Sequence, residues 1–226
     1  MPLDKPIVAI DGPAGSGKST VSKLVAKRLG IFYIDTGAMY RAATLKAMEQ
    51  KADLKDAEAL TKIAEGSKIT FATDPALGDI RVLLDGRDVS ADIRRPDVTG
   101  NIKYIARVPG VRRHMVSLQR SLAKDKGAVL EGRDITTVVF PDADYKFYLD
   151  ANVKERADRR FRELKQKGID VTPDEILDDV KKRDQSDRTR DVGPLKKAKD
   201  AVCIDTTDMN IDEVAEAILE KIKTGR

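Results

Sequence analysis

The chain of 226 residues is poor in the residue types that several common kinds of site require. It has one cysteine and one histidine, which excludes an internal disulfide framework, a cysteine metal cluster and a His-based zinc site, and argues against a Ser-His-Asp triad. Cys203 lies in the apolar run 201–204, so we expect it to be a buried strand residue. His114 follows two arginines on a predicted helix, so we expect it at the surface.

The composition also lacks the marks of a membrane or nucleic-acid partner. No apolar run approaches the roughly 18 residues that a membrane span needs, and the first six residues contain no apolar signal-peptide stretch. Aromatic residues make up 4% of the chain, tryptophan is absent, and the net charge is only +4. Base stacking and phosphate attraction therefore have little support. We expect a cytoplasmic and monomeric protein that binds neither membrane nor nucleic acid.

Short apolar runs alternate with amphipathic segments, which predicts an α/β core. The runs that predict strands are 7–10, 31–34, 128–130, 145–149 and 201–204. Helical spacing of apolar residues follows the first strand, ending at Gly30, and recurs at 111–122 and 211–222, where Asn210 is a plausible N-cap. Five strands with intervening helices predict a doubly wound parallel sheet whose connections are right-handed.

Two segments depart from that alternation. Residues 69–90 contain short strand-like runs and the turn dipeptide Asp85-Gly86, which predicts a small antiparallel insert. Residues 152–189 are highly charged and helical, with breaks at Gly168 and Pro173. A polar and weakly anchored helical pair is typical of a lid rather than of a core element.

The first strand leads directly into a phosphate-binding motif. Residues 12–19 read G-P-A-G-S-G-K-S, and the glycines at 12, 15 and 17 permit backbone angles that point N–H groups at one anion. Lys18 can reach the β- and γ-phosphates, and the hydroxyl of Ser19 can bind Mg²⁺. The dinucleotide-binding fingerprint fails because no third glycine follows. We therefore expect a nucleoside triphosphate and magnesium.

Polar signatures after the second and third strands and at the end of the lid indicate an acceptor site. They are residues 35–41, 131–134 and 183–190. Open α/β sheets bind ligands at the carboxyl ends of their strands, and arginine binds phosphate oxygens bidentately. A nucleotide acceptor needs no general base, because the second pKa of a phosphate monoester is about 6. These signatures predict a kinase for a phosphorylated acceptor.

At these positions the chain closely resembles the bacterial cytidylate (CMP) kinases, which are P-loop nucleoside monophosphate kinases. The resemblance rests on the segments 10–20, 34–41, 84–90, 131–134, 139–143 and 183–194, which span nearly the whole chain. It implies transfer of the γ-phosphate of ATP to CMP or dCMP. It also implies a division into a P-loop core (1–35, 106–151 and 191–226), an acceptor-binding region (36–105) that contains the insert at 69–90, and an arginine-rich lid (152–190).

The resemblance implies a role for each residue of the site. The catalytic residues are expected to be Lys18, Arg133, Arg183 and Arg190. The ATP site is expected to comprise Gly12, Pro13, Ala14, Gly15, Ser16, Gly17, Lys18, Ser19, Thr20, Arg156 and Arg160. The acceptor site is expected to comprise Thr36, Tyr40, Arg41, Lys103, Arg112, Arg133, Asp134, Arg183, Asp187 and Arg190. Within that last set, Arg41, Arg133 and Arg190 would hold the phosphate, Thr36, Arg112 and Asp134 the cytosine, and Arg183 with Asp187 the sugar.

Three positions depart from the residues that are usual in this family, and two other interpretations stay open. Lys103 stands where a serine normally touches the base, Glu131 where aspartate is usual, and Thr136 where glycine is common. One alternative is a P-loop kinase for another small acceptor, such as UMP, dTMP or shikimate. The other is a nucleotide-dependent nucleic-acid-binding protein, which the composition supports little.

Overall fold

The computed structural model describes residues 5–73, 80–124, 126–166 and 168–225 of the chain. The chain divides into two compact units. Unit 1 comprises Met1–Tyr33 and Ala123–Arg226, and unit 2 comprises Ile34–Leu122. The first boundary therefore falls inside the strand β2 (Phe32–Asp35). The predicted division into core, acceptor-binding region and lid uses other boundaries and stays a prediction.

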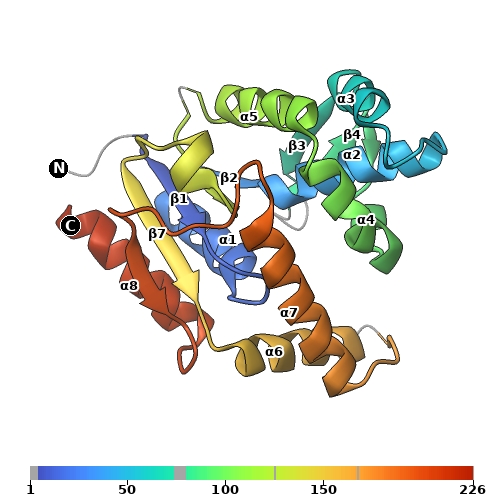
Figure 1. Cartoon of the computed structure of the whole chain (residues 1–226). Coiled ribbons are helices and arrows are strands. Elements are labelled where there is room, and N and C mark those ends of the chain that lie inside the picture. The colour runs from blue at the N-terminus through green and yellow to red at the C-terminus, as the bar shows by residue number, and fades with distance from the viewer. Residues whose placement is uncertain (1–4, 74–79, 125, 167, 226) are drawn as a thin grey trace. The chain divides into compact units, whose positions relative to one another are not determined.

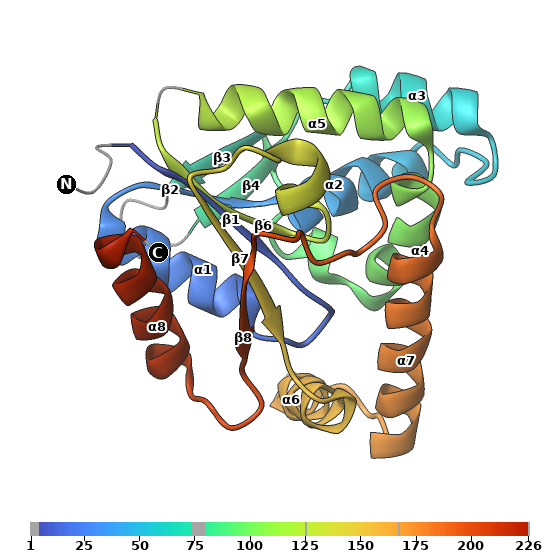
Figure 2. The same cartoon turned by 60° about the vertical axis from the view of Figure 1, so that its left-hand side comes forward.

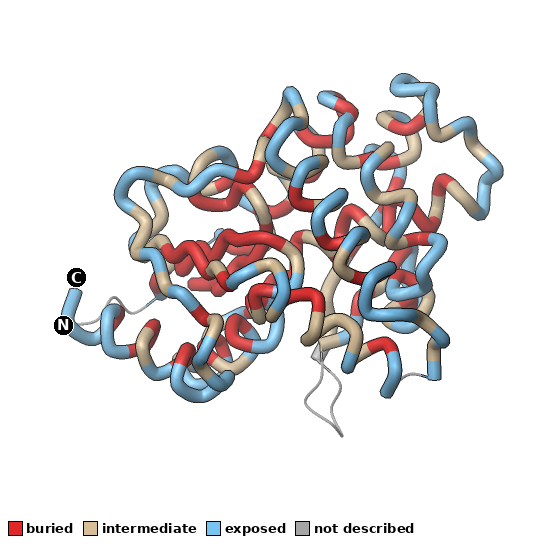
Figure 3. Tube along the Cα trace, turned by 60° about the horizontal axis from the view of Figure 1, so that its bottom comes forward, coloured by how far each residue is buried: buried red, intermediate tan, exposed pale blue. Residues whose placement is uncertain are grey.

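A five-stranded sheet with the order β2-β6-β1-β7-β8 forms the core of unit 1 (Figure 1). Its other strands are β1 (Ile7–Asp11), β6 (Ala128–Gly132), β7 (Tyr145–Asp150) and β8 (Val202–Asp205). β6, β1, β7 and β8 pair in parallel, and β6 is buried along its whole length. The buried stretches appear as continuous red tube in Figure 3, whereas helices alternate between buried and exposed positions. The predicted parallel sheet and all five predicted strands are confirmed.

Two helices of unit 1 pack together beside this sheet. They are α1 (Lys18–Leu29) and α8 (Ile211–Thr224), which lie side by side in Figure 2. α1 ends at Gly30, which adopts the left-handed conformation with φ 66° that glycine tolerates best. Asn210 caps α8 and forms a reciprocal capping box with Glu213. Both predicted helix ends are confirmed.

The charged segment forms the helices α6 (Val153–Gln166) and α7 (Pro173–Thr189). These two helices pack against each other around their own hydrophobic cluster. The buried members of that cluster are Ala157, Leu164, Ile176 and Val180. The break near Gly168 and Pro173 is where the sequence predicts it. The pair therefore has an internal core that its polar composition did not indicate.

Unit 2 is mainly helical and contains a small antiparallel sheet. Its helices are α2 (Thr36–Glu49), α3 (Ala57–Glu65), α4 (Pro96–Ala106), most of α5 (Pro109–Ala123) and the short 3₁₀ turn η1 (Asp92–Arg94). The strands are β3 (Ile69–Thr73), β4 (Ile80–Leu84) and β5 (Arg87–Asp88), and they pair in that order. Asp85 and Gly86 both have positive φ, 51° and 85°, as a primed hairpin turn requires. The predicted insert and its turn are confirmed.

Two predictions about single residues are wrong. Cys203 lies in β8 as expected, but it is exposed, because β8 is an edge strand whose residues are at most half-buried. His114 is half-buried rather than at the surface, and its Nε2 atom is fully buried. Of the two arginines that precede it, Arg112 is buried and Arg113 is exposed, so they were a poor guide to the exposure of His114. Within the described ranges, no helix is long and apolar enough to cross a membrane.

Candidate functional site

The loop between β1 and α1 has the tight geometry of a phosphate-binding loop. A Cβ atom added to Gly12 would lie 2.0 Å from the carbonyl oxygen of Leu149, and one added to Gly15 would lie 2.9 Å from that of Arg156. Only glycine fits so close to the backbone of β7 and α6. Gly17, with φ 85°, is the N-cap of α1, so the helix begins with its N–H groups at this loop. The predicted residues 12–20 therefore form one loop and the first turn of one helix.

Lys18 folds back over the loop that precedes it. Its Nζ donates to the carbonyl oxygen of Pro13 at 2.6 Å and to the Oγ of Ser16 at 3.3 Å, and its side chain is buried. Burial and, to a smaller extent, the charge of Arg133 lower the pKa of Lys18 to about 7, although the carboxylates nearby act in the opposite direction. A site that disfavours its own lysine charge is poised to receive an anion.

Ser19 and Glu131 come together at the ends of α1 and β6. The Oγ of Ser19 donates to Oε1 of Glu131 at 2.5 Å, and the hydroxyl of Tyr33 donates to the same oxygen at 3.2 Å. Glu131 and Tyr33 are both buried. Hydroxyl and carboxylate oxygens suit Mg²⁺, which usually binds proteins through one or two such groups and takes its other ligands from phosphate and water. Within the described residues there is no group of three or more His, Cys, Asp or Glu side chains that could hold a metal alone.

Asp187 of α7 lies between two of the predicted arginines. Its Oδ2 accepts from Nε of Arg133 at 2.7 Å, and its Oδ1 lies 3.9 Å from Nη1 of Arg190. Nη2 of Arg190 is also 3.6 Å from Oδ1 of Asp134, and both of these side chains are largely buried. Burial raises the pKa of Asp187, but the charge and hydrogen bond of Arg133 and the charge of Arg190 outweigh burial, so the pKa lies below its usual value. Four of the predicted acceptor residues therefore form one ionic cluster in unit 1.

The other predicted lid arginines have carboxylate partners within the helical pair. Arg183 lies 3.0 Å from Asp179 and Arg160 lies 2.7 Å from Glu163, each on the same helix. Arg156 is buried in contacts with α7 and with the phosphate loop, where its Nη1 donates to the carbonyl oxygen of Ala14 at 3.1 Å. Direct contact of Arg156 and Arg160 with ATP stays a prediction.

Unit 2 holds the remaining predicted residues around the start of α2. Asp35 caps α2 by accepting from the N–H of Ala38, and its other oxygen pairs with Nη2 of Arg41 at 2.9 Å. Thr36 opens the helix and is buried. The guanidinium of Arg112 lies 5.7 Å from the ring centre of Tyr40. Lys103, on α4, is exposed, and its Nζ lies over the ring of Tyr104.

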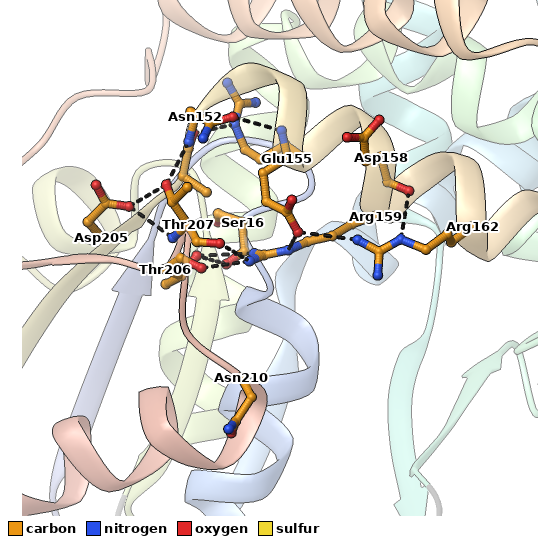
Figure 4. Close-up of polar contacts among 12 residues, drawn as sticks. Ser16, Asn152, Glu155, Asp158, Arg159, Arg162, Asp205, Thr206, Thr207 and Asn210 are labelled. Atoms are coloured by element: carbon orange, nitrogen blue, oxygen red, sulfur yellow. Dashed lines mark hydrogen bonds and ion pairs between the residues drawn. The ribbon is translucent and has the colours of Figure 1, made fainter.

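Arg159, on α6, contacts the segment that follows β8, and the sequence analysis assigned it no role. Its Nη2 donates to the carbonyl oxygens of Thr206 and Thr207 at 2.6 and 3.3 Å, and its Nε donates to Glu155 (Figure 4). The Oγ1 of Thr206 in turn donates to the carbonyl oxygen of Ser16 in the phosphate loop at 3.2 Å. The signal that could have found this segment is the polar run 205–207 at the carboxyl end of the last strand.

Comparisons with known proteins agree with this geometry. The family model described as Cytidylate kinase matches residues 8–224. The chain is 47% identical to the Cytidylate kinase of Pelotomaculum thermopropionicum, over 98% of this chain and 97% of that protein. It is also 47% identical to the Cytidylate kinase of Bacillus velezensis, over 98% of each chain. Among solved structures, an uncharacterized protein from Eubacterium ventriosum superposes with a TM-score of 0.54 at 14% identity, covering 97% of this chain and 99% of that one.

Proposed function

Because this chain belongs to the cytidylate kinase family, we propose that it transfers the γ-phosphate of ATP to CMP or dCMP, giving ADP and CDP or dCDP. One observation carries the proposal beyond family membership. Lys18 of the phosphate loop lies close enough to Arg133 and Asp187 for their charges to shift its pKa. The donor loop and the ionic cluster predicted to bind the acceptor therefore belong to one electrostatic site within unit 1.

The chemical problem of the reaction is to hold two anions together. ATP carries about four negative charges and the acceptor phosphate about two at neutral pH, and the acceptor needs no general base because its second pKa is about 6. Arg133 and Arg190 would supply fixed positive charge for the phosphoryl oxygens, and bound phosphate would favour the protonated form of Lys18. Arg183, on α7, is predicted to act with them. Stabilisation of the transferring group and in-line positioning account for catalysis of this kind.

Mg²⁺ fits the donor site as a group bound together with ATP. The hydroxyl of Ser19 and the carboxylate of Glu131 are hard oxygen ligands held 2.5 Å apart. When bound, the ion would neutralise phosphate charge during transfer. Glu131 is one methylene longer than the aspartate usual at this position, and its Oε1 accepts directly from Ser19.

Recognition of cytosine is assigned to Asp134, Thr36 and Arg112. Cytosine presents a donor amine at N4 and acceptors at N3 and O2, so a carboxylate and an arginine are complementary to it. Uracil has an oxygen in place of the amine and would leave the carboxylate unpaired.

An acceptor panel tests the proposal. ADP release would be measured with ATP and Mg²⁺ against CMP, dCMP, UMP, dTMP and shikimate at equal concentrations. The proposal requires CMP and dCMP to give the highest kcat/KM, and a higher value for any other acceptor would refute it.

We also propose that the enzyme acts as a cytoplasmic monomer, and light scattering with and without nucleotides would test its oligomeric state.

A further inference from the structure

A buried carboxylate at the end of β1 holds the segment that follows β6. Asp11 is completely buried and immediately precedes Gly12 of the phosphate loop. Its Oδ1 accepts from the N–H of Ile135 at 2.9 Å. Its Oδ2 accepts from the N–H of Thr136 at 2.7 Å and from the hydroxyl of Thr136 at 2.6 Å. Three donors from Ile135 and Thr136 thus converge on the carboxylate of Asp11, at the end of β1.

The carboxylate of Asp11 takes the place of an N-cap side chain for the short helix that follows β6. Ile135 begins a short π-helix, η2 (Ile135–Val139), and Asp134 occupies its N-cap position. Aspartate at such a position normally accepts from the first N–H groups of its own helix. Here the side chain of Asp134 makes no such bond, and Asp11 accepts from these N–H groups instead. The carboxylate of Asp134 is thereby directed elsewhere, within 3.6 Å of Arg190.

Burial disfavours the ionised form of Asp11 more than its hydrogen bonds favour that form. Burial raises the pKa of Asp11 to about 6, against the lowering effect of its hydrogen bonds to Thr136 and Ile135. At neutral pH the ionised carboxylate is therefore destabilising relative to its state in the unfolded chain. Buried groups with perturbed pKa values of this kind gather at functional sites.

We propose that Asp11 is a positioning residue for the acceptor: through Ile135 and Thr136 it holds the preceding pair, Arg133 and Asp134, in the orientation that binds the acceptor nucleotide. This inference rests on the proposed function for the identity of the acceptor. Thr136, which stands where glycine is common in the family, adds a side-chain hydrogen bond to the two backbone bonds. That hydroxyl makes the proposal testable without removing the buried charge.

The test compares two substitutions of Thr136 that differ in one hydroxyl group. Thr136→Val keeps the size of the side chain and both backbone bonds but loses the hydroxyl bond to Asp11, whereas Thr136→Ser keeps the hydroxyl. Thr44→Val in α2 is the matched control, because its buried hydroxyl donates to the carbonyl oxygen of Tyr40 at 2.8 Å. For each variant, the KM for CMP, the KM for ATP, the CMP-to-UMP ratio of kcat/KM and the unfolding midpoint would be measured.

The proposal expects Thr136→Val to raise the KM for CMP about 5- to 20-fold and to lower the CMP-to-UMP ratio, with the KM for ATP changing less than about 2-fold. Thr136→Ser should restore both values to within about 2-fold of the wild type. Thr44→Val should lower the midpoint without changing the ratio. If Thr136→Val lowers stability but leaves the KM for CMP and the ratio unchanged, or if it alters the KM for ATP equally, the proposal is overturned.

Failure of the proposed function would be recognised separately. If the wild-type enzyme prefers another acceptor, the cytidylate assignment fails, and the Thr136 series is then measured with that acceptor. A selective rise in its KM would still support positioning by Asp11. Asp11→Asn is the stronger variant, but its amide would place a donor against one of the two backbone N–H groups, so its interpretation requires the folded state to be confirmed by circular dichroism.

Discussion

Arg156 and Asp184 form a bidentate ion pair between α6 and α7. Nη1 of Arg156 donates to Oδ1 of Asp184 at 3.0 Å and Nη2 donates to Oδ2 at 2.7 Å, with the side chains 4% and 10% exposed. The same guanidinium donates to the carbonyl oxygens of Ala14 and Ala151. One buried side chain thus ties α7, which carries Asp187, to the loop that is predicted to bind the donor phosphates.

Removing one partner of this pair should be strongly destabilising. Arg156→Met or Asp184→Leu alone leaves a buried charge unpaired, so each should lower the free energy of unfolding by about 3–5 kcal/mol. The double variant should lose less than the sum of the two, because neither charge is then stranded. Urea unfolding measures these values. Arg28→Met, which breaks exposed pairs with Asp212 and Glu216, is the control and should cost about 1 kcal/mol or less. Single variants as mild as this control would contradict the prediction.

Lys18→Ala should depress kcat for every acceptor alike. The lysine is predicted to contact the phosphates of the donor, so its loss should reduce kcat by about 100- to 1,000-fold through lost electrostatic stabilisation. Steady-state kinetics with CMP, dCMP and UMP would measure the effect. A loss that depends on the acceptor would count against this role, because the acceptor base is predicted to be read by other residues.

Asp134→Ala should weaken discrimination between CMP and UMP more than it weakens ATP binding. The carboxylate is predicted to accept from the cytosine amine. Removing it should lower the CMP-to-UMP ratio of kcat/KM by a factor equivalent to about 1–3 kcal/mol of differential binding. The ratio would be measured with both acceptors at saturating ATP. Asp191→Ala, on the segment after α7, is a control of the same residue type. An unchanged ratio for Asp134→Ala would remove this residue from base recognition.

Local signals were sufficient where one residue determines the structure. The phosphate loop follows from glycine spacing after a strand, and the hairpin at Asp85-Gly86 follows from the need for two positive φ angles. The end of α1 at Gly30 and the cap at Asn210 are equally local. In each case the backbone conformation restricts the choice of residue, so the residue predicts the conformation.

Patterns failed where burial is set by distant parts of the chain. α2 was not predicted as a helix, because most of its residues are buried and an apolar face therefore does not stand out. Cys203 looked buried in an apolar run, and only its place on the edge strand exposes it. The contacts of Asp11 with Thr136 join residues 125 positions apart, and no spacing rule links them. Sequence motifs thus named the predicted site residues, whereas their supporting contacts required the fold.

Tyr33→Phe should weaken divalent cation binding without disturbing the sheet. It removes the hydroxyl that donates to Oε1 of Glu131 and leaves the carboxylate held only by Ser19 among the bonds described above. Loss of such a supporting bond typically weakens metal binding about 10-fold or more. Mn²⁺ binding in the presence of a non-hydrolysable ATP analogue, followed by electron paramagnetic resonance, measures this directly. Tyr145→Phe, at the amino end of β7, is the control, and equal Mn²⁺ affinity in the two variants would contradict the role of Tyr33.

The raised pKa of Asp11 predicts how stability depends on pH. With a pKa of about 6 in the folded protein and 3.8 as the ordinary value, Asp11 binds its proton more tightly when folded. Its contribution to stability is therefore fully present below pH 3.8 and is lost as the pH rises through 6. The unfolding free energy of the wild type, minus that of Asp11→Asn, should be about 2 kcal/mol lower at pH 7.5 than at pH 4.5.

Because the other titrating groups are common to both proteins, they largely cancel in this difference. Urea unfolding of both proteins at the two pH values would measure it, and a difference that stays constant or rises with pH would show that Asp11 is ionised throughout and that its three hydrogen bonds outweigh its burial.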